Sequence, residues 1–463
     1  MRVERFEVPG LAQYSYMVSD EGVAAVIDPI RDIDRYVAYA LENGLRIVAV
    51  METHIHADFV AGTVGLAEAT GAELCLSAYD IGERYVYRMP HRALADGDSI
   101  EVGGVRLQAL HTPGHTPEHL SFLLFEGGGE PTAMFSGDFL FVGSLGRPDL
   151  LGDAAKVGLA HALYRSLSGR LAGLPDAMKV YPGHGAGSLC GSGMSGRAET
   201  TLGVERATNS FFQLGEEEFV AKILGSVPPM PEYYPRMKEL NAKGARPLGT
   251  LPGGAGLSVE EVAAFAKDKE FVVVDLRTPE KFGGEHIAGA INIGAGANLP
   301  LWAGWMLDAE KKIVLIGEGE DEGETRLALG RVGLDRVAGH LEGGMTAWMA
   351  AGLPVVQTRL VTPGEVAHLP AGTVVLDVRN NAELGEGMIS GSRHAMLGGL
   401  PGLVDELSRE TRLVTVCAGG YRASLAASLL QADGFTNVGS LAGGLSAWVA
   451  AGLPIDREPD GQE

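Results

Sequence analysis

An internal repeat fills the second half of this 463-residue chain and restricts what that half can fold into. The Gly-Gly-x-x-Ala-Trp segment that starts at Gly343 returns at Gly443, and the Asp-x-Arg run at Asp275 returns at Asp377. The matches keep their order, with offsets of 100 (443 minus 343) and 102 (377 minus 275) residues. Two homologous domains of about a hundred residues each therefore occupy the C-terminal half.

Each repeat alternates short β-branched runs with helical patterns. Residues 272–276 and 413–416 are typical of buried strands, and residues 260–267 and 423–430 are typical of helices. This alternation predicts a parallel α/β sheet in each repeat. Residues 1–240 show no such repeat, and their strand-like runs are separated by loops rich in Gly and His, which predicts one large α/β domain.

The domain boundaries that follow are residues 1–240, a linker at 241–256, and the two repeats at 257–357 and 358–463.

A net charge of −22 argues against nucleic acid and anionic membrane surfaces as partners. Only three cysteines occur, so a disulfide scaffold is not expected. The N-terminus has no basic-then-apolar leader, and no apolar run approaches the roughly 18 residues of a membrane span. We therefore expect a soluble, cytoplasmic protein. The sequence is compatible with both a monomer and a homo-oligomer.

Histidine and aspartate gather in loops that follow apolar strand-like runs of the first domain. In chain order these are His54-Ile55-His56-Ala57-Asp58, His111-Thr112-Pro113-Gly114-His115, Ser136-Gly137-Asp138 and Tyr181-Pro182-Gly183-His184. Strand ends can deliver side chains to one common mouth. Any single histidine is more often an ordinary hydrogen-bonded loop residue, but four such clusters in order favour a site for a divalent transition metal.

On these motifs the first domain resembles the metallo-β-lactamase superfamily, whose fold is an αββα sandwich with the metal at one edge. It most resembles the persulfide dioxygenases, relatives of glyoxalase II, through the loop from Glu52 to Asp58, the loop from His111 to His115, and Gly146-Arg147-Pro148-Asp149. The resemblance implies one iron held by two His and one Asp, which match His56, His115 and Asp138. It leaves His54, Asp58 and His184 as residues that orient the ligands or serve as further ligands.

Phe59 departs from the superfamily pattern. The usual two-metal signature is His-x-His-x-Asp-His, and its last histidine serves the second metal. A phenyl ring cannot coordinate, so we expect one metal per chain, Fe(II), with Zn(II) left open. By the same resemblance Arg147 and Tyr181 are expected to contact glutathione; a surface salt bridge is an equal alternative for Arg147.

The repeats resemble rhodanese domains, and the second carries that family's active loop from Cys417 to Arg422. Cys417 is the expected nucleophile. Backbone N–H groups around Gly419 and Gly420, together with Arg422, are expected to stabilise its thiolate. At an offset of 100 the first repeat has Gly317 and Glu322 in place of Cys417 and Arg422, with further acids at 318, 320 and 321, so it is expected to be inactive.

The implied function is iron-dependent oxidation of glutathione persulfide, or a similar low-molecular-weight persulfide, by O₂ to sulfite, coupled to sulfur transfer through Cys417. Thiosulfate is the expected product or donor of that transfer. Cys190, in a glycine-rich loop after His184, is either a sulfur acceptor at the metal mouth or an inert thiol. The alternatives are a zinc-dependent thioester hydrolase of the glyoxalase II kind with an attached sulfurtransferase, and a non-enzymatic sulfur-sensing protein.

Overall fold

The computed structural model describes residues 1–250, 254–319 and 322–457. The chain divides into two units, Met1–Leu251 with Gly330–Gly333 and Pro252–Leu329 with Leu334–Glu463. Within the described ranges, no helix is both long enough and apolar enough to cross a bilayer.

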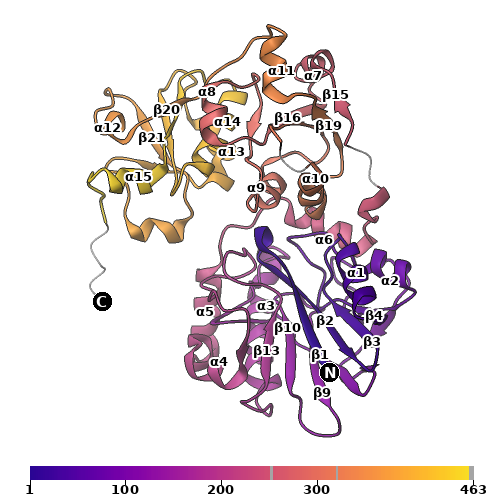
Figure 1. The fold of residues 1–463 in the computed structure, drawn as a ribbon. Coiled ribbons are helices and arrows are strands. Elements are labelled where there is room, and N and C mark those ends of the chain that lie inside the picture. The colour runs from indigo at the N-terminus through magenta and orange to yellow at the C-terminus, as the bar shows by residue number, and fades with distance from the viewer. Residues whose placement is uncertain (251–253, 320–321, 458–463) are drawn as a thin grey trace. The chain divides into compact units, whose positions relative to one another are not determined.

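Two six-stranded sheets form the centre of the first unit (Figure 1). The first sheet has the order β1 (Arg2–Val8), β2 (Gln13–Asp20), β3 (Val23–Ile27), β4 (Arg46–Met51), β5 (Glu73–Ser77) and β6 (Arg92–Leu94). The second has the order β14 (Thr200–Thr201), β13 (Lys179–Pro182), β10 (Ala133–Gly137), β9 (Leu120–Glu126), β8 (Val105–His111) and β7 (Ser99–Val102). Strands β3 to β6 run parallel, whereas β7 to β10 are antiparallel.

Side-chain alternation along the strands produces the layers. In β9, Phe122 and Leu124 belong to the core that the two sheets share, whereas Leu123 and Phe125 pack with the helices on the outer face. The helices of this unit are α1 (Asp34–Glu42), α2 (Thr63–Thr70), α3 (Asp153–Arg165), α4 (Leu202–Thr208), α5 (Glu216–Ser226) and α6 (Tyr234–Lys243). Figure 1 shows α3 to α5 on one side of the sheets and α1 and α2 on the other. The predicted αββα sandwich is confirmed.

The second unit contains two parallel sheets with the same strand order. The first repeat orders β15 (Gly256–Leu257), β19 (Val337–Leu341), β18 (Lys312–Ile316), β16 (Phe271–Asp275) and β17 (Ile291–Asn292). The second orders β20 (Arg359–Val361), β24 (Val438–Leu441), β23 (Leu413–Val416), β21 (Val374–Asp377) and β22 (Arg393–His394). The predicted parallel α/β sheets are confirmed.

Helices flank both of these sheets. In the first repeat they are α7 (Val259–Phe265), α8 (Pro279–Gly284), α9 (Leu299–Met306), α10 (Glu322–Arg331) and α11 (Gly344–Ala350). In the second they are α12 (Pro363–Val366), α13 (Leu400–Leu403), α14 (Tyr421–Ala432) and α15 (Gly444–Ala450). The α14 helix of the second repeat contacts β17 of the first: the Ser424 hydroxyl donates to Asn292 Oδ1 at 2.6 Å, and Asn292 N donates to the Ser428 hydroxyl at 3.0 Å. The first repeat thus supports the helix that follows Cys417.

The segment expected to be a linker, residues 241–256, is shorter in the structure because a helix and a strand occupy its two ends. Helix α6 continues to Lys243, and β15 begins at Gly256. The Asn241 amide explains the longer helix, because its Nδ2 donates to the carbonyls of His56 and Phe59 at 2.9 and 2.8 Å. Residues 251–253 of the expected linker lie outside the described residues.

Candidate functional site

The histidine and aspartate loops of the first unit all follow the carboxyl ends of strands. His54, His56 and Asp58 come after β4, and His115 comes after β8. Asp138 directly follows β10, and His184 follows β13. Each of these side chains is buried. Strand ends of both sheets therefore bring these side chains into one interior cluster.

His54, His115 and Asp138 form the tightest group in this cluster. Their candidate ligand atoms all lie within 4.8 Å of one another. Asp138 Oδ2 is 3.4 Å from His115 Nε2 and 3.9 Å from His54 Nε2. Burial lowers the pKa of both imidazoles well below its usual value, which keeps them neutral. A neutral imidazole is the form that binds a metal.

Several buried polar atoms of this cluster lack a hydrogen-bond partner among the described residues. They are His54 Nε2, His56 Nδ1, Asp58 Oδ1, His115 Nε2 and Asp138 Oδ2. Each such atom costs about 1–3 kcal/mol when it is buried unpaired. Imidazole nitrogens and carboxylate oxygens converging in this way are the donor set of a divalent transition metal, so the residues fit the implied metal.

A chain of hydrogen bonds sets the orientation of His54. Thr53 Oγ1 donates to Asp28 Oδ2 at 2.9 Å, so it accepts from His54 Nδ1, which is also 2.9 Å away. His54 Nε2 is then left with its lone pair free. His115 reaches the same state by another route, because its Nδ1 donates to the carbonyl of Arg147 at 2.8 Å. Both rings are thus fixed in the tautomer that offers Nε2 to a cation.

The tightest group differs from the expected ligand triad in one position. The expected triad of His56, His115 and Asp138 stays a prediction, and the compact group that the structure brings together contains His54 in place of His56. His56 donates from Nε2 to Asp28 Oδ1 at 3.1 Å, and its ring centroid lies 4.2 Å from that of His54. Its Nδ1 remains unpaired, so His56 adjoins the triad as a further ligand candidate.

His184 bridges two carboxylates. Its Nδ1 contacts Asp138 Oδ1 and its Nε2 contacts Asp58 Oδ2, each at 2.8 Å. Burial alone would lower the pKa of His184, but Asp138 and Asp58 raise it well above its usual value. His184 therefore holds both carboxylates in place, in keeping with the expected orienting role.

Cys190 lies at the same cluster. Its Sγ and the candidate ligand atoms of Asp58 and His184 lie within 4.8 Å of one another, and the side chain is buried. Burial, and then the carboxylates of Asp58 and Asp138, raise the pKa of the Cys190 thiol well above its usual value. A thiol here stays protonated unless a cation offsets the two carboxylates.

Neither residue expected to contact glutathione has an open position. Arg147 is 1% exposed, and its guanidinium pairs with both carboxylate oxygens of Asp149 at 2.6 and 2.8 Å. It also donates to the Leu189 carbonyl at 3.0 Å, so it fixes the loop that carries Cys190. Tyr181 lies in the core between the sheets, with its ring 5.2 Å from that of Phe135.

Three further residues shape the metal cluster and were not predicted as site residues from the sequence. Asp28, at φ +53°, accepts from Thr53 N at 2.7 Å as well as from Thr53 Oγ1 and His56. The buried Lys238 donates to the Ile55 carbonyl at 2.6 Å, and Asn241 holds the same loop. No local pattern signals Lys238 or Asn241, because the loop carbonyls of Ile55 and His56 to which they donate lie 183 and 185 positions away in the chain.

The second candidate centre surrounds Cys417, directly after β23. Its Sγ accepts hydrogen bonds from Gly420 N at 3.1 Å and Ala423 N at 3.4 Å. Gly420 has φ +103° and caps α14, which lets the loop turn its amides toward the sulfur. Gly419 lies in the same loop, with open space where a Cβ would project. The expected backbone cradle for a thiolate is present.

Gly444 brings the neighbouring loop against Cys417. Its φ is +59°, and a Cβ there would approach the Cys417 carbonyl oxygen to 2.4 Å. Leu445 N donates to that carbonyl at 2.7 Å. Only glycine permits this contact, which explains why the Gly-Gly pair recurs at the same place in both repeats.

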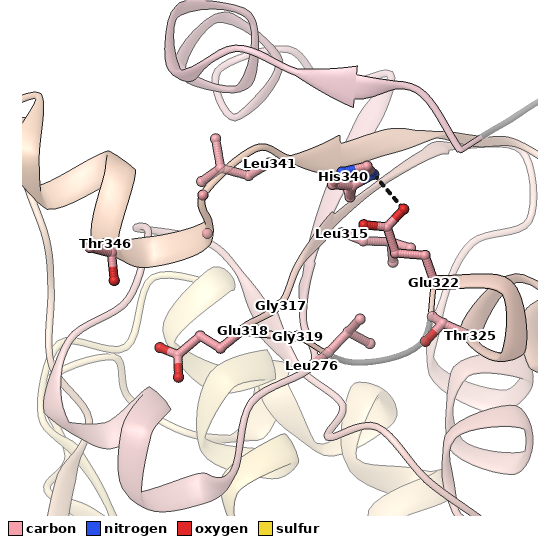
Figure 2. Close-up of a pocket in the computed structure, with 12 residues that line it drawn as sticks. Leu276, Leu315, Gly317, Glu318, Gly319, Glu322, Thr325, His340, Leu341 and Thr346 are labelled. Carbon is pink, nitrogen blue, oxygen red and sulfur yellow. Dashed lines mark ion pairs between the residues drawn. The ribbon is translucent and has the colours of Figure 1, made fainter.

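The corresponding region of the first repeat is a cavity of about 440 Å³ without a nucleophile (Figure 2). Gly317 stands where the second repeat has Cys417. Glu322 stands in the Arg422 position and lies 3.0 Å from His340 Nδ1, whereas Glu318 pairs with Lys281. The acids at 320 and 321 lie outside the described residues. These replacements support the expectation that this repeat has lost sulfur transfer.

Comparison with known proteins gives the family. The metallo-beta-lactamase superfamily pattern matches residues 8–184, and the rhodanese-like domain pattern matches residues 258–351 and 362–451. The hydroxyacylglutathione hydrolase of Polaromonas sp. is 31% identical over 244 residues, which cover 47% of this chain and 88% of that relative. The chain belongs to the metallo-beta-lactamase superfamily. Two rhodanese-like domains follow its metallo-beta-lactamase domain.

Other similar proteins include persulfide dioxygenases. The mitochondrial persulfide dioxygenase ETHE1 of Bos taurus is 30% identical over 215 residues, covering 46% of this chain and 76% of that relative. The crystal structure of a metallo-beta-lactamase from Staphylococcus aureus superposes with a TM-score of 0.67 at 34% identity. That superposition covers 74% of this chain and 98% of the other, so the similarity extends beyond the metallo-beta-lactamase domain.

Phe59 distinguishes this metallo-beta-lactamase domain from the two-metal signature of the superfamily. Its side chain is fully buried, with the ring centroid 4.4 Å from that of His56 and 6.5 Å from that of His184. A hydrocarbon ring therefore lies beside both imidazoles, at the position where the signature has a further nitrogen ligand.

Proposed function

We propose that the metallo-beta-lactamase domain is an iron-dependent persulfide dioxygenase and that the second rhodanese-like domain transfers sulfane sulfur through Cys417. The substrate is glutathione persulfide or a similar low-molecular-weight persulfide. The balanced reaction is RSSH + O₂ + H₂O → RSH + SO₃²⁻ + 2H⁺. The observation that carries the proposal is the unpaired set of two imidazoles and one carboxylate at His54, His115 and Asp138.

A metal held by two histidines and one carboxylate keeps open positions, and ferrous iron in such a site supplies the chemistry of dioxygen. The chain contributes the orientation of its ligands. The Asp28–Thr53 pair presents His54 Nε2, and the Arg147 carbonyl presents His115 Nε2. Phe59 supports one metal rather than two, because it replaces the histidine that would serve the second.

Cys190 is proposed as a sulfur acceptor next to this site. The balanced step is Cys190–SH + RSSH → Cys190–SSH + RSH, in which the thiolate takes the sulfane sulfur and the proton leaves with the released thiol. Its position beside Asp58 and His184 supports this role. Burial and the two carboxylates raise the pKa of the Cys190 thiol, so a cation bound at this cluster would favour the thiolate that the step needs.

Cys417 is proposed to combine its sulfane sulfur with sulfite. The balanced step is Cys417–S–S⁻ + SO₃²⁻ → Cys417–S⁻ + S₂O₃²⁻, and the amides of Gly420 and Ala423 stabilise the thiolate that leaves. Joining both chemistries in one chain raises the local concentration of the sulfur intermediate.

The test is oxygen uptake by protein purified anaerobically and loaded with Fe(II). The proposal predicts one O₂ consumed per two glutathione persulfides when thiosulfate is the product, and one O₂ per persulfide in Cys417→Ser, where sulfite is the product. Neither protein should hydrolyse the thioester S-lactoylglutathione. His115→Ala should abolish the uptake, whereas His161→Ala, a change on the outer helix α3, should not. Thioester hydrolysis by a zinc-loaded protein without oxygen uptake would instead establish a hydrolase of the glyoxalase II kind.

A further inference from the structure

Glu383 and Arg422 form a closed ion pair beside Cys417. The Arg422 guanidinium binds both carboxylate oxygens of Glu383, at 2.5 and 2.6 Å. Glu383 is itself held in place by the capping box of the short 3-10 helix Asn381–Glu386, in which one of its oxygens accepts from Asn380 N at 2.9 Å. The side chains of Arg422 and Glu383 are 16% and 27% exposed, so the pair lies half-buried.

The Glu383 carboxylate offsets the charge of Arg422, the cation that also faces the Cys417 sulfur. Burial alone would lower the pKa of Arg422, but the Glu383 carboxylate, and after it Cys417, raise it. The nearby Arg379 is paired with both carboxylate oxygens of Asp377 at 2.7 to 3.1 Å. With a Cys417 thiolate, the group of Cys417, Arg422 and Glu383 carries a net charge of −1, and its arginine fork is already bound to a carboxylate.

The first repeat has an ion pair between the corresponding loops with the opposite polarity. At the offset of 102, Lys281 occupies the position of Glu383, and it pairs with Glu318 on the loop after β18. Arg277 also approaches Glu318, at 3.5 Å. The fold therefore accepts either polarity at this place, so the acid at 383 is not dictated by the packing of the domain.

We infer that Glu383 is a specificity-determining residue that disfavours dianionic sulfur donors at Cys417 and favours donors with at most one negative charge beside the sulfane sulfur, such as an organic persulfide. This rests on the proposed function, in which Cys417 accepts a sulfane sulfur. A dianion such as thiosulfate gains more than a monoanion from a cation near the thiolate it approaches, and the Glu383 carboxylate offsets the charge of Arg422. The reverse step with sulfite passes through the same transition state, so Glu383 slows thiosulfate formation as well.

Two donors isolate the effect of charge. With thiosulfate the step is Cys417–S⁻ + S–SO₃²⁻ → Cys417–S–S⁻ + SO₃²⁻, and with methanethiosulfonate it is Cys417–S⁻ + CH₃SO₂S⁻ → Cys417–S–S⁻ + CH₃SO₂⁻. In both, the S–S bond of the donor breaks and its electron pair leaves with the oxidised sulfur. The donors differ by one unit of charge, so the ratio of their kcat/KM values cancels any general change in the nucleophilicity of Cys417.

The experiment measures that ratio for the full-length protein and for Glu383→Gln, with cyanide as acceptor. Glutamine retains an oxygen for the capping box but frees the Arg422 fork. The ratio of thiosulfate to methanethiosulfonate should rise by at least about fivefold, the effect of one unit charge a few ångströms from the reacting dianion. Glu386→Gln, an exposed charge on the same short helix, should leave the ratio unchanged.

A second variant guards against a folding defect. Arg422→Gln leaves the Glu383 carboxylate without its cation and should lower the ratio. An unchanged or reduced ratio in Glu383→Gln, or an increase in Arg422→Gln, overturns the inference about Glu383. Failure of both donors to load sulfur onto Cys417 in the unaltered protein would instead reject the proposed transfer function.

Discussion

Asp28 controls the metal cluster without belonging to it, and replacing it by asparagine tests that control. Three hydrogen bonds converge on its carboxylate: from Thr53 N at 2.7 Å, Thr53 Oγ1 at 2.9 Å and His56 Nε2 at 3.1 Å. Asparagine tolerates the left-handed φ of +53° at this position, so Asp28→Asn should preserve the backbone. The substitution changes only the side-chain group that faces the Thr53 hydroxyl, from a carboxylate oxygen to an amide.

In the Asp28→Asn variant, the new side-chain amide would donate to Thr53 Oγ1 where the carboxylate accepts. The Thr53 hydroxyl would then be free to donate to His54 Nδ1, which moves the ring proton to Nε2. That tautomer cannot bind a metal through Nε2. Loss of such an orienting partner typically weakens metal binding about 10- to 100-fold, which corresponds to about 1.4 to 2.7 kcal/mol.

The assay is competition with a chelator under anaerobic conditions, which gives the dissociation constant for Fe(II), with Co(II) as an optical probe. Asp80→Asn is the matched control, since Asp80 is equally buried and accepts from Tyr87 N at 2.7 Å. It should leave the dissociation constant within about twofold. The reasoning is refuted if Asp28→Asn binds metal as tightly as the unaltered protein, or if Asp80→Asn weakens binding to the same extent.

Three further predictions follow from the two centres. Asp138→Ala should release the metal and abolish oxygen uptake while sulfur transfer through Cys417 continues, as metal analysis and cyanide-coupled transfer would show; parallel loss of both activities would contradict separate centres. Tyr421→Phe removes a hydrogen bond to the Gly294 carbonyl at 2.9 Å and should lower the free energy of unfolding by about 0.5–1.5 kcal/mol in urea titrations; an unchanged midpoint would exclude that contribution. Gly444→Ala drives a Cβ against the Cys417 carbonyl and should reduce sulfur transfer at least tenfold without affecting oxygen uptake; normal transfer would show that the loop can move aside.

The sequence was sufficient to predict the features that depend on the order of motifs along the chain, namely the repeated domains and the loops that follow apolar runs. The offset of about 100 residues is sufficient to predict two equivalent sheets. The four polar loops could be assigned to one common mouth because each follows an apolar strand-like run. The loss of Cys417 and Arg422 from the first repeat is likewise read directly from the alignment of the repeats.

Features set by side-chain orientation could not be predicted in this way. His54 and His56 are two positions apart in one loop, and the choice between them depends on Asp28, which approaches from another strand. Arg147 looks like a substrate-binding arginine in sequence, but its neighbour Asp149 and the Leu189 carbonyl occupy it. Glu383 lies 39 positions from Arg422 and outside the active loop, so no motif connects them.

The central claim is that two separate centres in one chain perform consecutive sulfur chemistry. It is tested most directly by the products of glutathione persulfide oxidation in the unaltered protein and in Cys417→Ser. We expect both proteins to consume oxygen. The unaltered protein should use one O₂ per two persulfides and form thiosulfate, and the variant should use one O₂ per persulfide and form sulfite alone. The account is contradicted if the variant still forms thiosulfate at the unaltered rate, or if it no longer consumes oxygen.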